Sequence, residues 1–167
     1  MELNVAQAQK MAGESFPFEL EETVGPFNYN GRSLVLSKPL QLQGKYTFDG
    51  KGFFVEAKAQ TVLRQRCARC GETFEQPYAF PVNERFSKAS EPSKDDMYPY
   101  LGDRLELTQA VMDNFYLHLP LAGVCRPDCR GLCPICGANR NLHACRCQPN
   151  QASGPFAALA ALTHAEE

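Results

Sequence analysis

The chain has 167 residues, about the size of one domain, and folding at this length buries roughly two-thirds of the extended chain's surface. Hydrophobic residues make up 44%, charged residues 22%, and the formal net charge is -2, which excludes disordered, collagen-like and coiled-coil sequences. No apolar run approaches the roughly 20 residues of a membrane span, and residues 1–16 lack the apolar segment of a secretory signal. We therefore expect a globular protein of the cytoplasm.

The first half of the chain predicts mainly extended structure. Residues 1–10 predict one or two helical turns, and residues 14–23 predict an extended acidic segment. Apolar and polar residues alternate over residues 40–48, which is typical of a strand, and Asp49-Gly50 then predicts a hairpin turn. The return strand places one set of residues on a single face: Val55, Ala57, Ala59, Thr61 and Leu63.

A third strand is predicted after Cys70, and it contains two prolines. Because proline cannot donate a ladder hydrogen bond, Pro77 and Pro81 predict that this strand lies at a sheet edge or is bulged. Residues 34–86 as a whole predict an antiparallel meander. The apolar residues that share one register of the third strand are Phe74, Tyr78, Phe80, Val82 and Phe86.

Residues 87–103 lack periodicity and combine Ser, Pro, Lys and Asp, which predicts an exposed loop. Thr108 is the expected cap of a helix that covers one face of the sheet and ends before Pro120. The apolar stripe of this helix is expected to be Ala110, Val111, Phe115 and Leu117.

Eight cysteines are the most informative feature of the sequence. Disulfides do not persist in a reducing compartment, so clustered cysteines there favour metal binding or redox chemistry. Two pairs have the spacing Cys-x2-Cys followed directly by Gly, which accepts the positive φ of a turn that directs two thiolates at one ion. The candidate metal ligands are Cys67, Cys70, Cys125, Cys129, Cys133, Cys136, Cys145 and Cys147.

Zinc fits these residues because four thiolates form a closed tetrahedral site without histidine, so eight cysteines predict two structural Zn2+ sites. Loop length favours a compact group within residues 133–147, formed by Cys133, Cys136, Cys145 and Cys147. Cys67 and Cys70 would then join Cys125 and Cys129. The alternative unites Cys125, Cys129, Cys133 and Cys136, and leaves the other four together.

Other chemistries fit less well. A thioredoxin-like redox pair would begin a helix after a strand, whereas Cys67 and Cys70 lie between two predicted strands. Iron–sulfur clusters take four cysteines at different common spacings. Catalytic zinc would keep an open position, yet the plausible ligands are cysteines, with His143 as a possible replacement for one of them. We find no Ser/His/Asp set, phosphate loop or carboxylate pair, and expect no enzymatic activity.

Positive charge is concentrated around the cysteines. Residues 119–147 carry four Lys+Arg against one Asp+Glu, although the whole chain is slightly acidic. The guanidinium group suits contact with RNA phosphates, but it also neutralises the negative charge of a four-thiolate zinc site. The candidate RNA-binding residues are Arg64, Arg66, Arg69, Arg126, Arg130, Arg140 and Arg146.

These features define the expected organisation. Residues 1–120 are expected to form a β-rich domain with its covering helix, and residues 121–147 a zinc-binding cysteine cluster packed on it. Residues 148–167 are expected to be a linker with a short helix. The expected fold class is α+β, an antiparallel β-meander covered by a helix, with a cysteine-rich C-terminal segment stapled by zinc.

The order of the features resembles the bacterial YceD family (DUF177). A β-rich half with a Cys-x2-Cys hairpin is followed by a helix that runs into Leu119-Pro120, and then by CRPDCRGLCPICGANRN at residues 125–141. The resemblance covers nearly the whole chain. It implies a role in the accumulation of large-subunit ribosomal RNA, with no established catalytic activity.

Two functions follow from this resemblance and the cysteine cluster. The first is a non-enzymatic ribosome biogenesis factor that promotes accumulation of 23S rRNA, with large-subunit rRNA, a pre-ribosomal particle or a ribosomal protein as partner. The second is a zinc-dependent protein-interaction module that acts indirectly on ribosome assembly. Neither requires a membrane or a small-molecule substrate.

Overall fold

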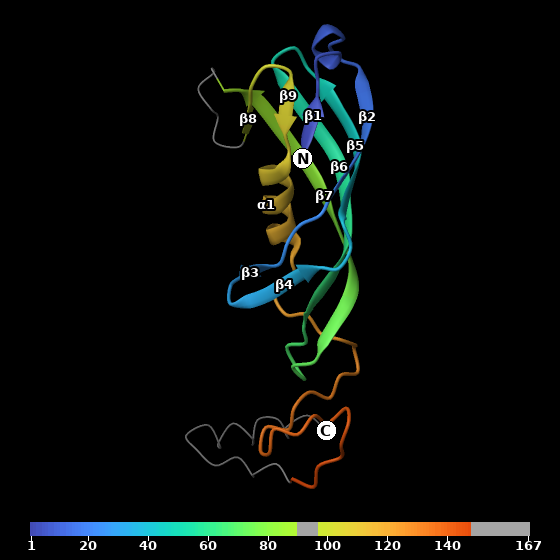
Figure 1. Cartoon of the computed structure of the whole chain (residues 1–167), viewed down its shortest axis with the longest axis vertical. Coiled ribbons are helices and arrows are strands. Elements are labelled where there is room, and N and C mark those ends of the chain that lie inside the picture. Colours follow the sequence, from blue (N-terminus) through green and yellow to red (C-terminus); the bar gives the residue numbers. More distant parts are fainter. Residues whose placement is uncertain (90–96, 148–167) are drawn as a thin grey trace, which may run out of the picture.

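The fold is a mainly antiparallel sheet with one helix against it, followed by a segment without regular structure (Figure 1). The computed structural model describes residues 1–89 and 97–147. Its elements are β1 (Glu2–Asn4), the 3-10 turn η1 (Ala8–Lys10), β2 (Ser15–Glu22), β3 (Phe27–Tyr29), β4 (Arg32–Leu36), β5 (Leu40–Phe48), β6 (Gly52–Arg66), β7 (Thr73–Lys88), β8 (Tyr98–Tyr100), β9 (Arg104–Glu106) and α1 (Thr108–His118). The α+β class is confirmed.

The two longest strands, β6 and β7, form the hairpin around which the sheet is built. Their antiparallel register runs from Gly52 opposite Ser87 to Arg66 opposite Thr73. β5 pairs with the first half of β6, β2 pairs with the other edge of β5, and β4 pairs with the second half of β6. The predicted strand over residues 40–48, the turn after it, the return strand and the third strand are therefore confirmed as β5, β6 and β7.

β4 departs from the meander predicted over residues 34–86. It pairs with β6 rather than β5, with Leu36 opposite Leu63. β4 and β5 run in the same direction along one edge of β6, because β6 is long enough to pair with both. Asn30 and Gly31 have positive φ angles of 50° and 75°, and they close a β3–β4 hairpin that the sequence analysis did not include.

The prolines of β7 occupy an edge, as predicted. Among the described residues, Pro77 and Pro81 lie where β7 pairs with β6 alone, since β8 joins β7 only at Phe86–Lys88. Both prolines fit without a bulge, because the register with β6 is unbroken along the whole hairpin.

Helix α1 covers the inner face of the sheet, and its apolar stripe is narrower than predicted. Val111 and Phe115 are fully buried, and the Phe115 ring packs against those of Tyr78 and Phe80, with centroids 5.1 and 5.7 Å away. Leu117 is 78% exposed, so its assignment to the stripe was wrong. At 3.6 residues per turn, Leu117 lies about 200° around the helix from Phe115.

The start of α1 also differs from the prediction. Thr108 is the first helical residue rather than the cap, and the preceding residue, Leu107, makes no side-chain capping bond. The Thr108 hydroxyl instead hydrogen-bonds to the carboxylate of Glu106. Asn114 takes a buried position on the inner side of the helix, where its amide donates to the Ala110 carbonyl at 3.0 Å.

Tertiary pairing overrides the local pattern at two places. The predicted N-terminal helical turns shrink to η1, because Leu3 pairs with Leu105 in a small β1–β9 sheet and Val5 is fully buried. The predicted loop 87–103 contains the end of β7 and also β8, whose Tyr100 is 3% exposed. An extended acidic segment near residues 14–23 is confirmed as β2.

Some expectations fall outside the described residues, namely the middle of the loop at 90–96 and the linker and helix at 148–167. Within residues 1–89 and 97–147, no helix combines the length and the apolar character that crossing a bilayer requires.

Candidate metal centres

The eight cysteines form two groups of four, beyond the end of the sheet at which β6 connects to β7. In each group the sulfur atoms all lie within 4.8 Å of one another. Group A, as we call it, consists of Cys67, Cys70, Cys125 and Cys129, and group B of Cys133, Cys136, Cys145 and Cys147. This is the grouping that loop length favoured.

The sulfur separations suit four ligands of one ion. In group A, the Sγ atoms of Cys67 and Cys129 are 3.9 Å apart, and those of Cys70 and Cys125 are 3.8 Å apart. A regular tetrahedron with metal–sulfur bonds of about 2.3 Å requires sulfur atoms about 3.8 Å apart, whereas a disulfide needs about 2.05 Å. All eight cysteines are free thiols. The donor set therefore fits a closed four-sulfur metal site.

Each group is built on a turn with the same hydrogen bonds. In group A, Gly71 has a φ of 76°, and its N–H donates to the Cys67 carbonyl at 2.9 Å. The Cys67 N–H in turn donates to the backbone carbonyl of Glu72 at 2.8 Å. In group B, Gly137 has φ 73° and donates to the Cys133 carbonyl at 2.9 Å. The Cys133 N–H donates to the backbone carbonyl of Ala138 at 2.8 Å, which is the counterpart of the Cys67–Glu72 bond in group A.

Backbone N–H groups also point at the first sulfur of each turn. The N–H groups of Arg69 and Cys125 each lie 3.4 Å from Sγ of Cys67. Burial opposes ionisation of Cys67, but hydrogen bonds from the backbone outweigh it and lower its pKa to about 6. The backbone N–H groups of Cys136 and Ile135 likewise lower the pKa of Cys133 to about 6.

Other thiols of the two groups have a raised pKa. Burial and the neighbouring cysteine sulfurs raise the pKa of Cys125 to about 12. A side-chain hydrogen bond with Cys136, followed by burial, raises the pKa of Cys147 to about 12. Four thiols this close resist full ionisation because their negative charges repel, so a cation is needed to hold all four as thiolates.

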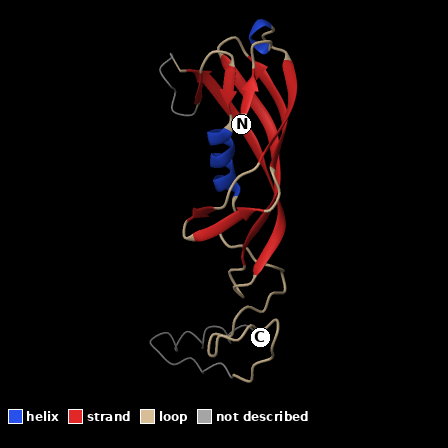
Figure 2. Cartoon of the chain, in the orientation of Figure 1, coloured by secondary structure: helices blue, strands red, loops and turns tan. Residues whose placement is uncertain are grey.

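Group A ties the β6–β7 hairpin to the segment after α1. Cys67, Cys70 and Cys129 are 3–5% exposed, and with Phe74 and Val124 they form a small core of their own. The chain within residues 119–147 contains no helix or strand, only an isolated bridge (Figure 2). Apart from Leu119, the buried side chains of this segment are those of Cys129 and Cys133.

Asn141 connects the two groups, a role that the sequence analysis missed. It lies in the loop of group B, and its amide donates to Sγ of Cys129 in group A at 3.4 Å. Its Oδ1 accepts from the backbone N–H of Arg130 at 2.9 Å and from the Arg126 guanidinium at 3.0 Å. A polar residue between two ligand pairs was the available signal, but only the folded loop brings it to the other group.

Four of the candidate arginines have structural partners. Arg64 forms an ion pair with Glu75 at 2.6 Å, and Arg66 donates to the Gly71 carbonyl at 3.2 Å. Arg69 donates to the carbonyls of Pro127 and Cys129, both at 3.2 Å, which fastens the hairpin to group A. Arg126 bonds to Asn141 and pairs with Asp128 at 3.4 Å.

The other three candidates, Arg130, Arg140 and Arg146, are exposed; Arg140 and Arg146 lie within the group B segment, and Arg130 lies between Cys129 of group A and Cys133 of group B. Their side chains make no hydrogen bond or ion pair with any residue in the described ranges 1–89 and 97–147. His143 is also exposed and belongs to neither cysteine group. The exposed charge of this segment therefore lies mainly at group B.

Several proteins are similar to this chain. An uncharacterized protein of Mycobacterium tuberculosis is 29% identical over 145 residues, which are 82% of this chain and 69% of that protein. An uncharacterized protein of Mycobacterium leprae is 26% identical over 132 residues, covering 72% and 59%. The chloroplastic "Large ribosomal RNA subunit accumulation protein YCED homolog 1" of Zea mays is 34% identical over 58 residues, which are 34% of this chain and 20% of the plant protein.

No solved structure matches this chain significantly. The family model described as "Large ribosomal RNA subunit accumulation protein YceD" matches residues 55–163. The matched part includes most of β6, all of β7 and α1, and all eight cysteines, and it is more than half of the chain. The chain therefore belongs to the YceD family.

Proposed function

We propose that this protein is a non-enzymatic ribosome biogenesis factor of the cytoplasm that promotes the accumulation of 23S rRNA. In this proposal, two structural zinc ions hold residues 121–147 against the tip of the β6–β7 hairpin. The segment then presents arginines to large-subunit rRNA or a pre-ribosomal particle. The description of the family and the name of the maize relative support the ribosomal role.

The observation that carries the proposal is the pair of four-sulfur groups in a segment that has little else to hold it together. Residues 119–147 lack helix and strand, and their buried core consists largely of cysteine side chains. A metal ion would supply the missing folding free energy, as it does in other small cysteine-rich domains. Zinc is the proposed ion, because all donors are sulfur and each group is complete with four.

The proposed RNA contact rests on Arg130, Arg140 and Arg146. Their side chains are exposed and free of partners among the described residues, in contrast to Arg64, which is paired with Glu75. Each zinc site with four thiolates would carry a formal charge of -2, so nearby arginines also stabilise the filled site. Phosphate contact and charge neutralisation are therefore separable roles that one set of variants can distinguish.

A protein partner is the second candidate, and a specific observation favours it. Group B is surrounded by exposed apolar side chains, with Leu132 at 47%, Ile135 at 56% and Leu142 at 67% exposure. Apolar residues gathered on a small exposed module are typical of a protein interaction site. In this version the zinc sites shape a protein-binding surface, and the effect on rRNA is indirect.

Sedimentation of cell lysates separates the two candidates. We expect the wild-type protein to comigrate with immature large-subunit particles and to leave that fraction after ribonuclease treatment. A complex of unchanged size after ribonuclease would favour the protein partner. Absence from ribosomal fractions, together with normal 23S rRNA levels in cells that lack the protein, would contradict the proposed function.

A charge variant tests the arginine surface directly. Replacing Arg130, Arg140 and Arg146 together by Gln should weaken binding to large-subunit rRNA. It should also reduce the salt dependence of binding, because a variant with fewer phosphate contacts releases fewer counterions from the RNA when it binds. The matched control replaces Lys10, Lys38 and Lys58, which are exposed on the β-rich part, by Gln. Loss of zinc with unchanged RNA affinity in the arginine variant would show that these residues only neutralise the sites.

A further inference from the structure

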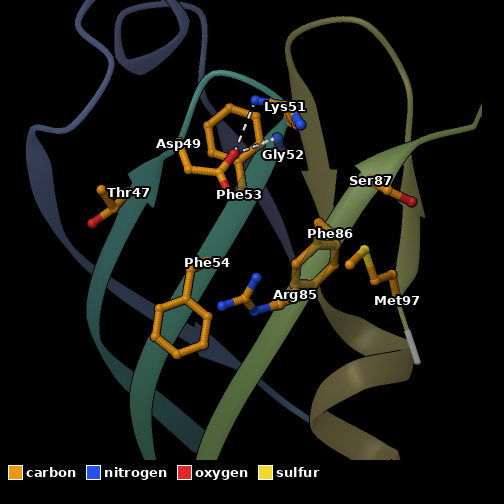
Figure 3. Close-up of a pocket in the computed structure, with 10 residues that line it drawn as sticks. All are labelled: Thr47, Asp49, Lys51, Gly52, Phe53, Phe54, Arg85, Phe86, Ser87 and Met97. Atoms are coloured by element: carbon orange, nitrogen blue, oxygen red, sulfur yellow. Dashed lines mark hydrogen bonds between the residues drawn. The ribbon is translucent and has the colours of Figure 1, made fainter. Parts of the chain in front are cut away.

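A pocket of about 470 Å³ lies at the end of the β6–β7 hairpin remote from the cysteines (Figure 3). It is formed where the β5–β6 turn meets the end of β7, and its lining includes Thr47, Lys51, Phe54, Arg85 and Ser87. The volume is in the range of sites that hold small ligands. Neither the cysteine groups nor the arginines around group B contribute to it.

The aromatic side chain of Phe54 distinguishes this end of the sheet. Phe54 is half-buried and stands between Thr47 of β5 and Arg85 of β7 in one cross-strand row. The alternate residues of β6 that share this face with it are Glu56, Lys58, Gln60, Val62, Arg64 and Arg66, of which none is aromatic. An aromatic ring among these mostly polar side chains offers a stacking surface to a planar ligand.

Two cations line the pocket: Arg85 lies beside this ring, and Lys51 lies in the β5–β6 turn next to Asp49 and Gly52 (Figure 3). The guanidinium carbon of Arg85 is 5.6 Å from the centroid of the Phe54 ring, and Figure 3 shows the two side chains next to each other. Neither Arg85 nor Lys51 forms an ion pair with a carboxylate of the described residues. The pocket therefore combines an apolar surface with positive charge that an anionic ligand can neutralise.

The acidic residue of the pocket is already engaged. The carboxylate of Asp49 accepts the backbone N–H groups of Lys51 at 2.9 Å and Gly52 at 2.8 Å, and these bonds lower its pKa. Asp49 offsets one of the two positive charges, which leaves the group of Asp49, Lys51 and Arg85 with a net charge of about +1. A ligand with a planar aromatic part and a single negative charge matches this arrangement.

We propose that the pocket binds one unpaired nucleotide of single-stranded RNA, with its base against Phe54 and its phosphate near Lys51 and Arg85. Proteins that bind single-stranded RNA commonly combine aromatic stacking with basic side chains in this way. The inference rests on the proposed function and extends it. The pocket and group A lie at opposite ends of β6, whose 15 residues span roughly 45–50 Å at about 3.3 Å per residue.

The test uses full-length, metal-loaded protein and two labelled probes, an eight-uridine RNA and an abasic ribose–phosphate octamer of equal charge. Fluorescence anisotropy measures the affinity of wild type and of the variants Phe54→Leu and Phe54→Tyr. We expect Phe54→Leu to weaken binding of the uridine probe at least about fivefold, the lower end of base–aromatic stacking. Phe54→Tyr keeps the aromatic face and should bind within about twofold of wild type.

The charge contribution has its own variant and control. Arg85→Gln should weaken binding of both probes, whereas Lys58→Gln, which removes a cation from the neighbouring strand β6 outside the pocket, should change neither. Thermal unfolding of every variant verifies that the fold is intact. The abasic octamer should bind Phe54→Leu and wild type equally, because it has no base to stack.

Three outcomes would overturn the pocket proposal. The first is equal affinity of wild type and Phe54→Leu for the uridine probe, and the second is an equal loss for both probes. The third is crosslinking of a photoreactive amino acid at position 54 to a ribosomal protein instead of RNA. If wild type still binds large-subunit rRNA through the arginines of group B in these cases, the proposed function stands and only the pocket assignment fails.

Discussion

The side-chain amide of Asn141 donates a hydrogen bond to Sγ of Cys129 at 3.4 Å, although the two residues belong to different cysteine groups. The same side chain accepts the N–H of Arg130, which immediately follows Cys129. The loop of group B thus stabilises a thiolate of group A. Hydrogen bonds of this kind, from residues that do not bind the metal themselves, orient and tune the ligands.

Replacing Asn141 by Ala should therefore weaken zinc binding at group A, even though Asn141 is not a ligand. Loss of such a partner typically reduces metal affinity about 10- to 100-fold. Competition with a chromophoric chelator measures both sites, and Asn28→Ala, at an exposed position of β3, is the matched control. Unchanged affinity at both sites would show that the two groups act independently.

Metal analysis tests the two groups themselves. Purified protein should contain close to two zinc ions per chain, with thiols that react only after a chelator or denaturant is added. Cys133→Ser should lose one ion and leave group A filled, because every ligand of group A comes from elsewhere. Iron with visible absorption, or eight thiols that react at once, would contradict two structural zinc sites.

Cys67→Ser should damage the fold more than Cys133→Ser does. Group A joins the β6–β7 connection to the segment after α1, and two further backbone N–H groups point at Cys67 Sγ. Without this ligand, residues 121–147 should separate from the hairpin, which limited proteolysis would reveal as cleavage after α1. Equal proteolysis of the two variants would argue that group A carries no special structural role.

The end of α1 offers a test within the β-rich part. The buried Tyr78 hydroxyl donates to the Phe115 carbonyl at 2.8 Å, one of the last carbonyls of the helix. Tyr78→Phe should lower the free energy of unfolding by about 1–2 kcal/mol, because the carbonyl loses its partner while buried. Urea denaturation measures the change, and Tyr116→Phe is the control, since the described structure gives the Tyr116 hydroxyl no hydrogen bond. A similar change in both variants would assign the effect to packing.

The β5–β6 turn predicts a pH dependence. Hydrogen bonds from Gly52 and Lys51 lower the pKa of Asp49 in the folded state. A carboxyl group with a lowered folded pKa stabilises the fold above its unfolded pKa of about 3.9, and this contribution disappears as the pH falls through the folded value. Wild type should be more stable than Asp49→Ala at pH 7, and the difference should shrink below about pH 4. A constant difference down to pH 2 would contradict this origin.

The matched control for the pH experiment is Asp103→Ala. Asp103 is exposed, and its side chain has no hydrogen bond or ion pair within the described residues. Its replacement removes an exposed carboxylate and leaves the hydrogen bonds of the Asp49 turn in place, so it controls for the loss of a surface charge.

The sequence predicted the parts of this molecule whose patterns are local. Strict alternation identified β5 to β7, and loop length favoured the cysteine grouping that the structure shows. Long-range pairing was not visible in the sequence: Leu3 forms a strand because Leu105 lies beside it. Leu117 was assigned to the helix stripe from its apolar character, although its angular position places it in solvent. Asn141 escaped detection because its partner, Cys129, belongs to the other cysteine group, and only the folded loop brings the two side chains together.

The prolines at the edge of β7 have a consequence for the isolated protein. A long uncovered strand is a template on which a second chain can add, and such addition leads to aggregation. Pro77 and Pro81 remove two backbone donors from the part of β7 that β8 does not cover. A strand of a second copy that paired with this edge would lack hydrogen-bond donors at two positions four residues apart. The prolines therefore disfavour edge-to-edge aggregation of newly synthesised copies at this strand.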